Sequence, residues 1–249
     1  MEPGLQVSTA DGVATVVMHN PAKRNVMTTA MWRAFPGLLD HLEADPAVRV
    51  LVLTGAGDTF CAGADIGSLR ESPTESQGLA VAAEEALAAF PKPTLAAVRG
   101  YCVGGGCQLA AACDLRFAAE GSAFGITPAK LGIVYPAPST RRLASLVGPA
   151  TAKYLLFSAE LIDADRALRT GLVDEVLPAD CLDKRVAEFT GILTSRSLLT
   201  QAAAKEFASA PALPEREERW SRLARESGEA AEGVAAFLER RSPDFTWRG

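Results

Sequence analysis

The sequence has few of the residues that build metal centres and nucleophilic triads. It contains two histidines, His19 and His41, and no CxxC pair. A zinc site is therefore not expected. A Ser-His-Asp triad would have to use one of these histidines, and no G-x-S-x-G elbow is present to carry its serine. His41 falls on an expected helix, where we predict that it is exposed. We expect reduced, buried thiols at the five cysteines, Cys61, Cys102, Cys107, Cys113 and Cys181.

Long apolar runs and an excess of basic charge are also missing. The 249 residues are 48% hydrophobic and 22% charged, and the net charge is −5. This balance is that of a globular protein and argues against wrapping nucleic acid. No run approaches the roughly 18 apolar residues of a membrane span, and residues 1–4 lack the pattern of a signal peptide. We therefore expect a cytoplasmic protein without membrane or nucleic-acid partners, with either one large α/β domain or one domain that carries a helical appendage.

The motifs of nucleotide binding are incomplete. Residues 54–60 (TGAGDTF) follow an expected strand, but Phe60 replaces the third glycine of G-x-G-x-x-G and no helical pattern begins there. Neither glycine-rich loop of the chain ends in Lys-Ser or Lys-Thr, as a Walker loop would. The sequence therefore argues against a dinucleotide and against a P-loop nucleotide.

The first half of the chain alternates strands and helices. Strands are predicted over residues 13–18 and 48–53, with a helix over 28–44 between them, which favours a crossover connection. A second helix is predicted over residues 78–90, followed by a strand over 94–98.

Helix formers dominate from about Ser139 onward. Asp163 is the expected start of a helix that stops at Gly171, and a strand is predicted over residues 173–177. The last fifty residues read as two or three amphipathic helices. These helices pack either on a neighbouring subunit or on their own core.

Two loops of small residues carry the strongest functional signal. They are residues 60–65 (FCAGAD) and residues 100–108 (GYCVGGGCQ), each preceded by an apolar run. The second loop runs into a helix-forming stretch, so its free N–H groups are expected at the positive end of a helix. Tight turns would explain one such loop, but two of them predict an oxyanion hole built from backbone N–H groups.

Four segments together resemble the crotonase (enoyl-CoA hydratase/isomerase) superfamily. The first, residues 19–25, combines His-Asn-Pro with Arg-Asn; the others are residues 61–66 (CAGADI), 100–108 (GYCVGGGCQ) and 171–176 (GLVDEV). The resemblance implies an α/β fold, a spiral of ββα units with a helical C-terminal region. We place the boundary between residues 1–195 and 196–249. It also implies a homotrimer or homohexamer.

The resemblance implies a function as well. Members of the superfamily, lyases and isomerases of fatty-acid metabolism among them, stabilise the enolate of an acyl-CoA thioester with two backbone N–H groups, which fall here on Ala64 and Gly105. No metal or separate cofactor is implied, because coenzyme A is part of the substrate. A solvated turn is the alternative for the basic pair at residues 23–24. The implied coenzyme A contacts are Lys23, Arg24, Val26, Ala62, Asp65 and Ile66.

The chain departs from the pattern of a hydratase of this superfamily. The resemblance places the two glutamates of a hydratase at Gln108 and Pro128, and no Asp or Glu lies between Gly121 and Glu160. An amide is not a base and proline has no side-chain proton, so general acid–base hydration loses both groups. Efficient hydratase activity is therefore not expected.

Two alternatives to a base-assisted reaction stay open. Residues 127–135 are similar to a stretch of methylmalonyl-CoA decarboxylase in which a tyrosine at the place of Tyr135 faces the substrate carboxylate. Against this, that enzyme has a histidine where this chain has Ala64, and Tyr135 could be a packed aromatic before Pro136. The other alternative is a catalytically silent acyl-CoA-binding protein. It is suggested by superfamily members that have a glutamine at the place of Gln108 and, later in the chain, a segment like residues 141–148 (RRLASLVG).

Overall fold

The computed structural model describes residues 2–209 and 213–249 and is built around a sheet of six strands. The first two strands pair antiparallel and every other pair in this sheet is parallel. In spatial order the strands are β1 (Gly4–Ala10), β2 (Val13–His19), β3 (Val50–Gly55), β4 (Thr94–Val98), β6 (Leu115–Ala119) and β9 (Glu175–Leu177). A smaller sheet contains β5 (Tyr101–Val103), β7 (Ala123–Gly125) and β8 (Ile162–Asp163).

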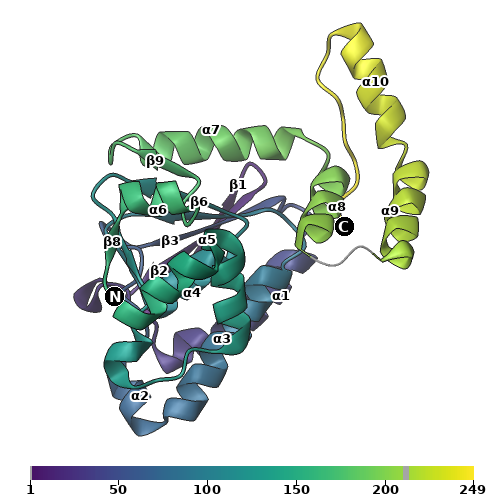
Figure 1. Ribbon diagram of the computed structural model, residues 1–249. Helices are drawn as coiled ribbons and strands as arrows, with labels where there is room; N and C mark the ends of the chain where they lie inside the picture. The colour runs from purple at the N-terminus through teal and green to yellow at the C-terminus, as the bar shows by residue number, and fades with distance from the viewer. Residues whose placement is uncertain (1, 210–212) are drawn as a thin grey trace.

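Helices cover the sheets and form the C-terminal region (Figure 1). The α-helices of the core are α1 (Thr29–Ala44), α2 (Ile66–Glu71), α3 (Pro73–Ala89), α4 (Gly105–Ala112), α5 (Ala137–Ser158), α6 (Ala164–Thr170) and α7 (Leu182–Ser195). They are followed by α8 (Leu198–Ser209), α9 (Pro214–Ser227) and α10 (Glu229–Glu239). Short 3-10 turns lie at η1 (Pro21–Lys23) and η2 (Pro128–Leu131).

The predicted crossover from β2 through α1 to β3 is confirmed. The Thr28 side chain accepts a hydrogen bond from the amide of Met31 at 3.2 Å and so caps the start of α1. Trp32 and Phe35 on α1 are buried against the core, which gives the helix its apolar face. The predicted helix over residues 78–90 is α3, which begins five residues earlier, at Pro73.

The later elements begin and end at the predicted residues with one difference. Asp163 caps α6 by accepting from the amide of Arg166 at 2.7 Å, and Gly171 ends the helix with a φ of 80°. The strand predicted over residues 173–177 is shorter than expected and begins at Glu175. The reason is that the amide of Val173 bonds back to Ala167 O at 3.2 Å and closes the end of α6.

One expectation for the cysteines is wrong. Four of them are buried free thiols as predicted, but Cys181 is exposed, because it lies in the turn that precedes α7 and not in the apolar core. Burial raises the pKa of Cys61 to about 12, so this thiol stays protonated. His41 is exposed, as expected for the outer face of α1.

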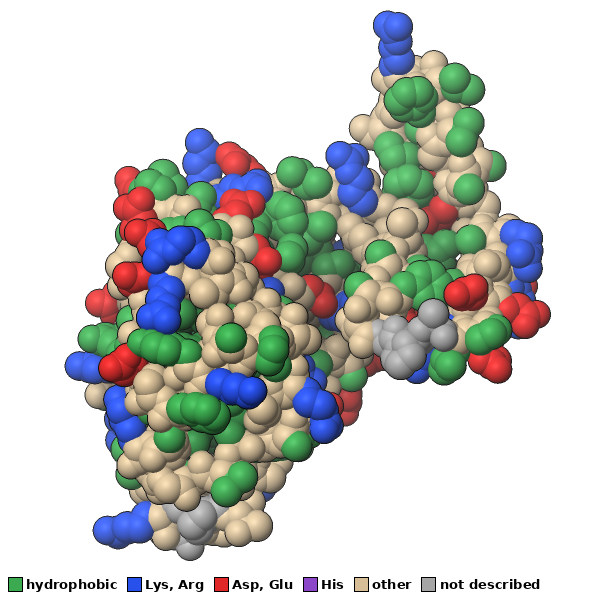
Figure 2. Space-filling view, in the orientation of Figure 1, with side chains coloured by type: hydrophobic (Ala, Val, Ile, Leu, Met, Phe, Trp, Pro, Cys, Tyr) green, Lys and Arg blue, Asp and Glu red, His purple; other side chains and the backbone are tan. Residues whose placement is uncertain are grey.

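The C-terminal helices extend away from the sheet. Figure 1 shows α9 and α10 projecting beyond α8, with the last residues of the chain returning toward α8. Three apolar side chains on α10 are largely exposed, Val234 (62%), Phe237 (83%) and Leu238 (74%). Figure 2 shows apolar side chains along this projecting part. No helix within the described ranges is long and apolar enough to span a membrane.

Candidate active site

The two small-residue loops run side by side beyond the ends of β3 and β4. The amide of Cys61 donates to Tyr101 O at 2.9 Å, and the amide of Val103 donates to Cys61 O at 2.9 Å. Cys61 and Cys102 therefore face each other in a parallel bridge. Residues three positions further along each loop, Ala64 and Gly105, are brought together by this register. A Cβ atom on Gly105 would lie 3.6 Å from the amide nitrogen of Ala64.

The residue before each of these amides is a glycine with a positive φ, which orients the N–H group that follows it. Gly63 has a φ of 116° and Gly104 a φ of 55°, conformations that side chains larger than hydrogen disfavour. Gly105 is the first residue of α4, where an N–H has no partner within the helix and sits at the positive end of the helix dipole. Neither the Ala64 nor the Gly105 amide donates a hydrogen bond to another residue of the described chain.

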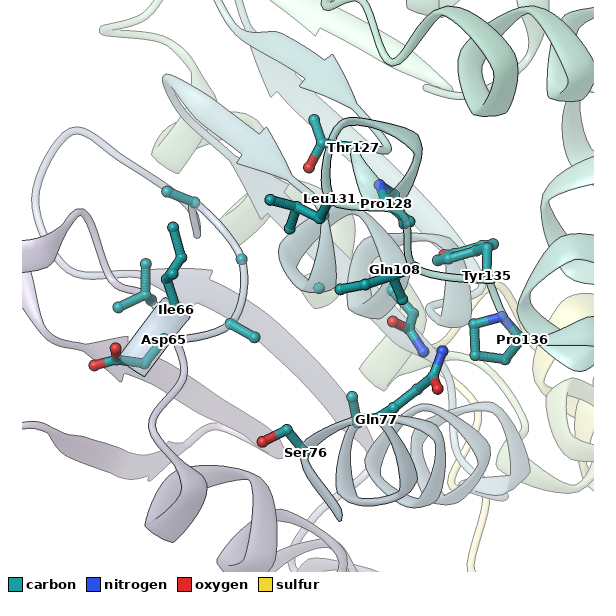
Figure 3. Close-up of a pocket in the computed structure, with 18 of the residues that line it drawn as sticks. Asp65, Ile66, Ser76, Gln77, Gln108, Thr127, Pro128, Leu131, Tyr135 and Pro136 are labelled. Atoms are coloured by element: carbon teal, nitrogen blue, oxygen red, sulfur yellow. The ribbon is translucent and has the colours of Figure 1, made fainter. Parts of the chain in front are cut away.

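Ala64 and Gly105 both line a cavity of about 820 Å³. Figure 3 shows Asp65 and Ile66 on one side of this cavity, with Gln108 and Tyr135 on the opposite side. The structure brings together nine of the ten residues singled out from the sequence: Lys23, Val26, Ala62, Ala64, Asp65, Ile66, Gly105, Gln108 and Tyr135.

Arg24 is the residue that the structure places elsewhere. It is absent from the lining of the cavity, and its guanidinium lies over the ring of Tyr101, 5.0 Å from the ring centroid. A cation over an aromatic face is attracted by the ring's negative charge density. The sequence showed two adjacent basic residues without showing that the chain turns between them, since Arg24 itself adopts a φ of 52°.

A charged pair lies at the side of the cavity formed by the first loop. Lys23 Nζ is 2.8 Å from Asp65 Oδ2. The hydrogen bond from Lys23 holds the pKa of Asp65 below its ordinary value, and a bond from the amide of Gly67 adds to this. Asp65 is the one carboxylate among the described lining residues, and it is already paired.

The opposite side of the cavity contains a buried polar cluster, which we call the Glu84 cluster (Glu84, Gln108, Ser139 and Arg142). Nε2 of Gln108 donates to Glu84 Oε2 at 2.6 Å and to Ser139 Oγ at 3.2 Å. Ser139 Oγ and the Arg142 guanidinium both donate to Glu84, which is 1% exposed. Arg142 also bonds to the outer carboxylate of Glu85, at 2.9 Å.

Sequence reasoning missed Glu84, although the sequence contains a signal for it. Ala80, Ala83 and Leu87 are buried on α3, and their helical spacing places position 84 on the same face. A glutamate within an otherwise apolar stripe is unusual, because an ionised carboxylate is costly to bury without partners. That placement predicts a partner on a facing element, and Arg142 on α5 is that partner.

Tyr135 lies between the cavity and the core. It is half-buried, lines the cavity and packs against the main hydrophobic cluster. Desolvation raises the pKa of the Tyr135 hydroxyl well above its usual value, and the nearby charge of Glu84 adds to this. The hydroxyl is therefore protonated at ordinary pH and can donate a hydrogen bond.

The cavity thus combines two free backbone donors with mainly neutral walls. Pro128 and Thr127 form part of the wall next to Gln108, and they supply no acidic or basic group. Such a site can polarise a carbonyl oxygen placed between the two amides. It offers no free carboxylate of the described chain to abstract a proton at that point.

Comparison with known proteins identifies the family. The enoyl-CoA hydratase/isomerase family profile matches residues 8–248. The chain is 34% identical over 244 residues to the crotonyl-CoA hydratase of Syntrophomonas wolfei, covering 94% of each chain. It is 33% identical to the 2,3-dehydroadipyl-CoA hydratase of Escherichia coli, covering 98% of this chain and 99% of the relative.

Solved structures agree with the sequence relatives. A crystal structure of an enoyl-CoA hydratase/isomerase family member superposes with a TM-score of 0.92 at 38% identity and full coverage of both chains. The enoyl-CoA hydratase of Bacillus anthracis gives a TM-score of 0.91 at 29% identity, covering 97% of this chain and 98% of that one. The predicted crotonase-like α/β fold is confirmed by these superpositions, and the chain belongs to the enoyl-CoA hydratase/isomerase family.

Proposed function

We propose that this chain is an acyl-CoA enzyme that holds the thioester oxygen of its substrate between the N–H groups of Ala64 and Gly105. The observation that carries the proposal is the convergence of two backbone amides, without partners in the described chain, on one cavity. Chemistry next to a thioester carbonyl places negative charge on its oxygen. Donors aimed at that oxygen bind the enolate more tightly than the ground state, which accelerates the reaction.

Coenzyme A would enter past the first loop. Val26, Ala62 and Ile66 supply apolar wall for the pantetheine arm, and Lys23 supplies a cation for a phosphate. Its partner Asp65 holds the Lys23 ammonium at this side of the cavity. Arg24 lies outside the residues that line the cavity, stacked on Tyr101 of the second loop.

The reaction itself is a lyase or isomerase step, and we propose that efficient hydration is not among its activities. The relatives are named hydratases. In this chain, however, the positions that the resemblance assigns to the glutamates of a hydratase hold Gln108 and Pro128, and both line the cavity. Water addition needs a group to accept and return a proton, and neither residue can do this.

Decarboxylation of a methylmalonyl-type thioester is the second candidate. It is favoured by the protonated hydroxyl of Tyr135 on the cavity wall and by the absence of a free carboxylate among the described lining residues. Loss of carbon dioxide generates the enolate without a base, so decarboxylation does not need a glutamate at the positions of Gln108 and Pro128. A silent acyl-CoA-binding protein is the third candidate, and it differs from both by binding thioesters without product.

Tyr135→Phe separates these candidates when the chain is incubated with crotonyl-CoA and methylmalonyl-CoA in turn. Loss of a hydrogen bond to the substrate carboxylate is expected to lower carbon dioxide release by about 10-fold to 100-fold. Efficient hydration of crotonyl-CoA, monitored as loss of the enoyl absorbance, is expected of neither the wild-type chain nor the variant, and any slow hydration should be the same in both. Carbon dioxide release that is insensitive to the substitution would remove Tyr135 from the mechanism.

We also propose assembly into a homotrimer or homohexamer in the cytoplasm. Val234, Phe237 and Leu238 expose a continuous apolar face on α10, and exposed apolar faces of this kind mark contact surfaces in soluble proteins. A second copy of the chain is the partner that the resemblance implies for this face.

A further inference from the structure

The Glu84 cluster determines which end of the Gln108 amide faces the cavity. Glu84 faces the guanidinium of Arg142, a group that can only donate, and an ionised carboxylate can only accept. The atom of the Gln108 amide that faces Glu84 must therefore be the NH2 group. The 2.6 Å contact from Gln108 Nε2 to Glu84 Oε2 has this arrangement, and Ser139 Oγ forms a second partner at 3.2 Å.

The other end of the same amide is the carbonyl oxygen. Gln108 lines the cavity and stands three residues after Gly105 on α4. Residues at this spacing share one face of a helix, and side chains lean toward the helix N-terminus. The amide of Gln108 is thus placed beside the carbons that follow a thioester carbonyl held at Gly105. With Nε2 turned to Glu84, Oε1 is the atom that meets those carbons.

We propose that Glu84 is a positioning residue that fixes the Gln108 amide with its oxygen toward the cavity, so that the site selects acyl-CoA thioesters carrying a hydrogen-bond donor near carbon 3. This inference rests on the proposed function and adds a selectivity to it. A hydroxyl group can donate to Oε1. A ketone at the same position cannot, and it places two acceptor oxygens against each other.

Glu84→Gln reverses the direction of the hydrogen bond between residues 84 and 108 and keeps the size and shape of the side chain at position 84. Arg142 still requires an acceptor, so the new amide at position 84 turns its oxygen to Arg142 and its NH2 toward Gln108. Gln108 must then offer its oxygen to position 84 and its own NH2 to the cavity. The group that Gln108 presents to the cavity changes from a hydrogen-bond acceptor to a donor, so a thioester with an acceptor at carbon 3 should bind more tightly.

Calorimetric titration at pH 6.5 with acetoacetyl-CoA, 3-hydroxybutyryl-CoA and butyryl-CoA tests this inference. The wild-type chain should bind 3-hydroxybutyryl-CoA about tenfold more tightly than acetoacetyl-CoA. Glu84→Gln should bind acetoacetyl-CoA about tenfold more tightly than wild type does, with little change for the hydroxy compound, which can donate or accept. A gain of affinity for one ligand is a result that simple loss of packing does not produce.

Glu85→Gln is the matched control. Glu85 bonds to the same arginine from the exposed side and has no contact with Gln108 among the described hydrogen bonds, so its substitution should leave the ratio of the two affinities unchanged. Gln108→Leu serves if Glu84→Gln does not fold, and it should bring the ratio close to one by removing the oxygen.

Two results would overturn the inference. One is a wild-type chain that binds the hydroxy and keto compounds equally. The other is a folded Glu84→Gln variant that keeps the wild-type preference. Binding of butyryl-CoA separates these failures from a failure of the proposed function, because a chain that binds none of the three thioesters is not an acyl-CoA enzyme at all.

Discussion

Gly105→Pro is expected to lower turnover of the thioester substrate by about 10²–10³-fold, the usual cost of one oxyanion donor. Proline has no N–H, and it is tolerated at the first position of a helix, which is where Gly105 lies. The loss therefore falls on the amide and not on α4. The measurement is kcat/KM for the thioester that the chain converts, or thioester affinity if it converts none.

Gly105→Ala is the control for this substitution. Its Cβ would lie 2.9 Å from Trp32 Cζ2, and proline brings a Cβ to the same place, so both variants share this contact with Trp32, while only proline replaces the N–H with a ring methylene. Circular dichroism of both variants checks that α4 still forms. Equal activities of the proline and alanine variants would show that the Gly105 amide does not act on the substrate.

Arg142→Met is expected to lower the free energy of unfolding by about 3 kcal/mol. Glu84 is 1% exposed and would lose its cationic partner, while Arg142 is itself partly open to solvent, with 20% of its side chain exposed, which keeps the cost at the low end for a broken buried pair. For a chain of this length the melting temperature should fall by about 6–12 °C.

Arg141→Met provides the comparison for thermal unfolding. Arg141 is the exposed neighbour of Arg142 on α5, and substitutions at such surface positions usually change stability by less than about 0.5 kcal/mol. The two melting temperatures should therefore differ clearly. If both variants have the melting temperature of the wild-type chain, the ion pair between Arg142 and Glu84 does not contribute to the stability of the fold.

The sequence alone predicted the elements whose signals are local. The helix predicted over 28–44 and the strand before it lie within one residue of their predicted bounds, because β-branched runs and helical spacing are local signals. The two glycine loops were placed for the same reason. The strand predicted over 48–53 is present but lies two residues later, at Val50–Gly55. Short strands such as β5 and β7, with three residues each, gave no readable pattern, because their pairing depends on elements distant in the chain.

The site shows the same division. The two small-residue loops could be inferred from the chain, and the resemblance to the family assigned Ala64 and Gly105 within them; their approach follows from the parallel pairing of the loops. Glu84 and Arg142 lie 58 residues apart, and only packing of α3 against the start of α5 makes them partners. The resemblance assigned both Lys23 and Arg24 to coenzyme A, and a local turn separates their side chains.

The central claim is that two backbone amides bind one thioester oxygen, and the infrared stretch of that carbonyl tests it most directly. Crotonyl-CoA labelled with carbon-13 at the thioester carbonyl should show a lower stretching frequency when bound to the wild-type chain than in water. The shift should persist in Gly105→Ala and diminish in Gly105→Pro. A bound thioester whose carbonyl frequency equals that in water would contradict the account.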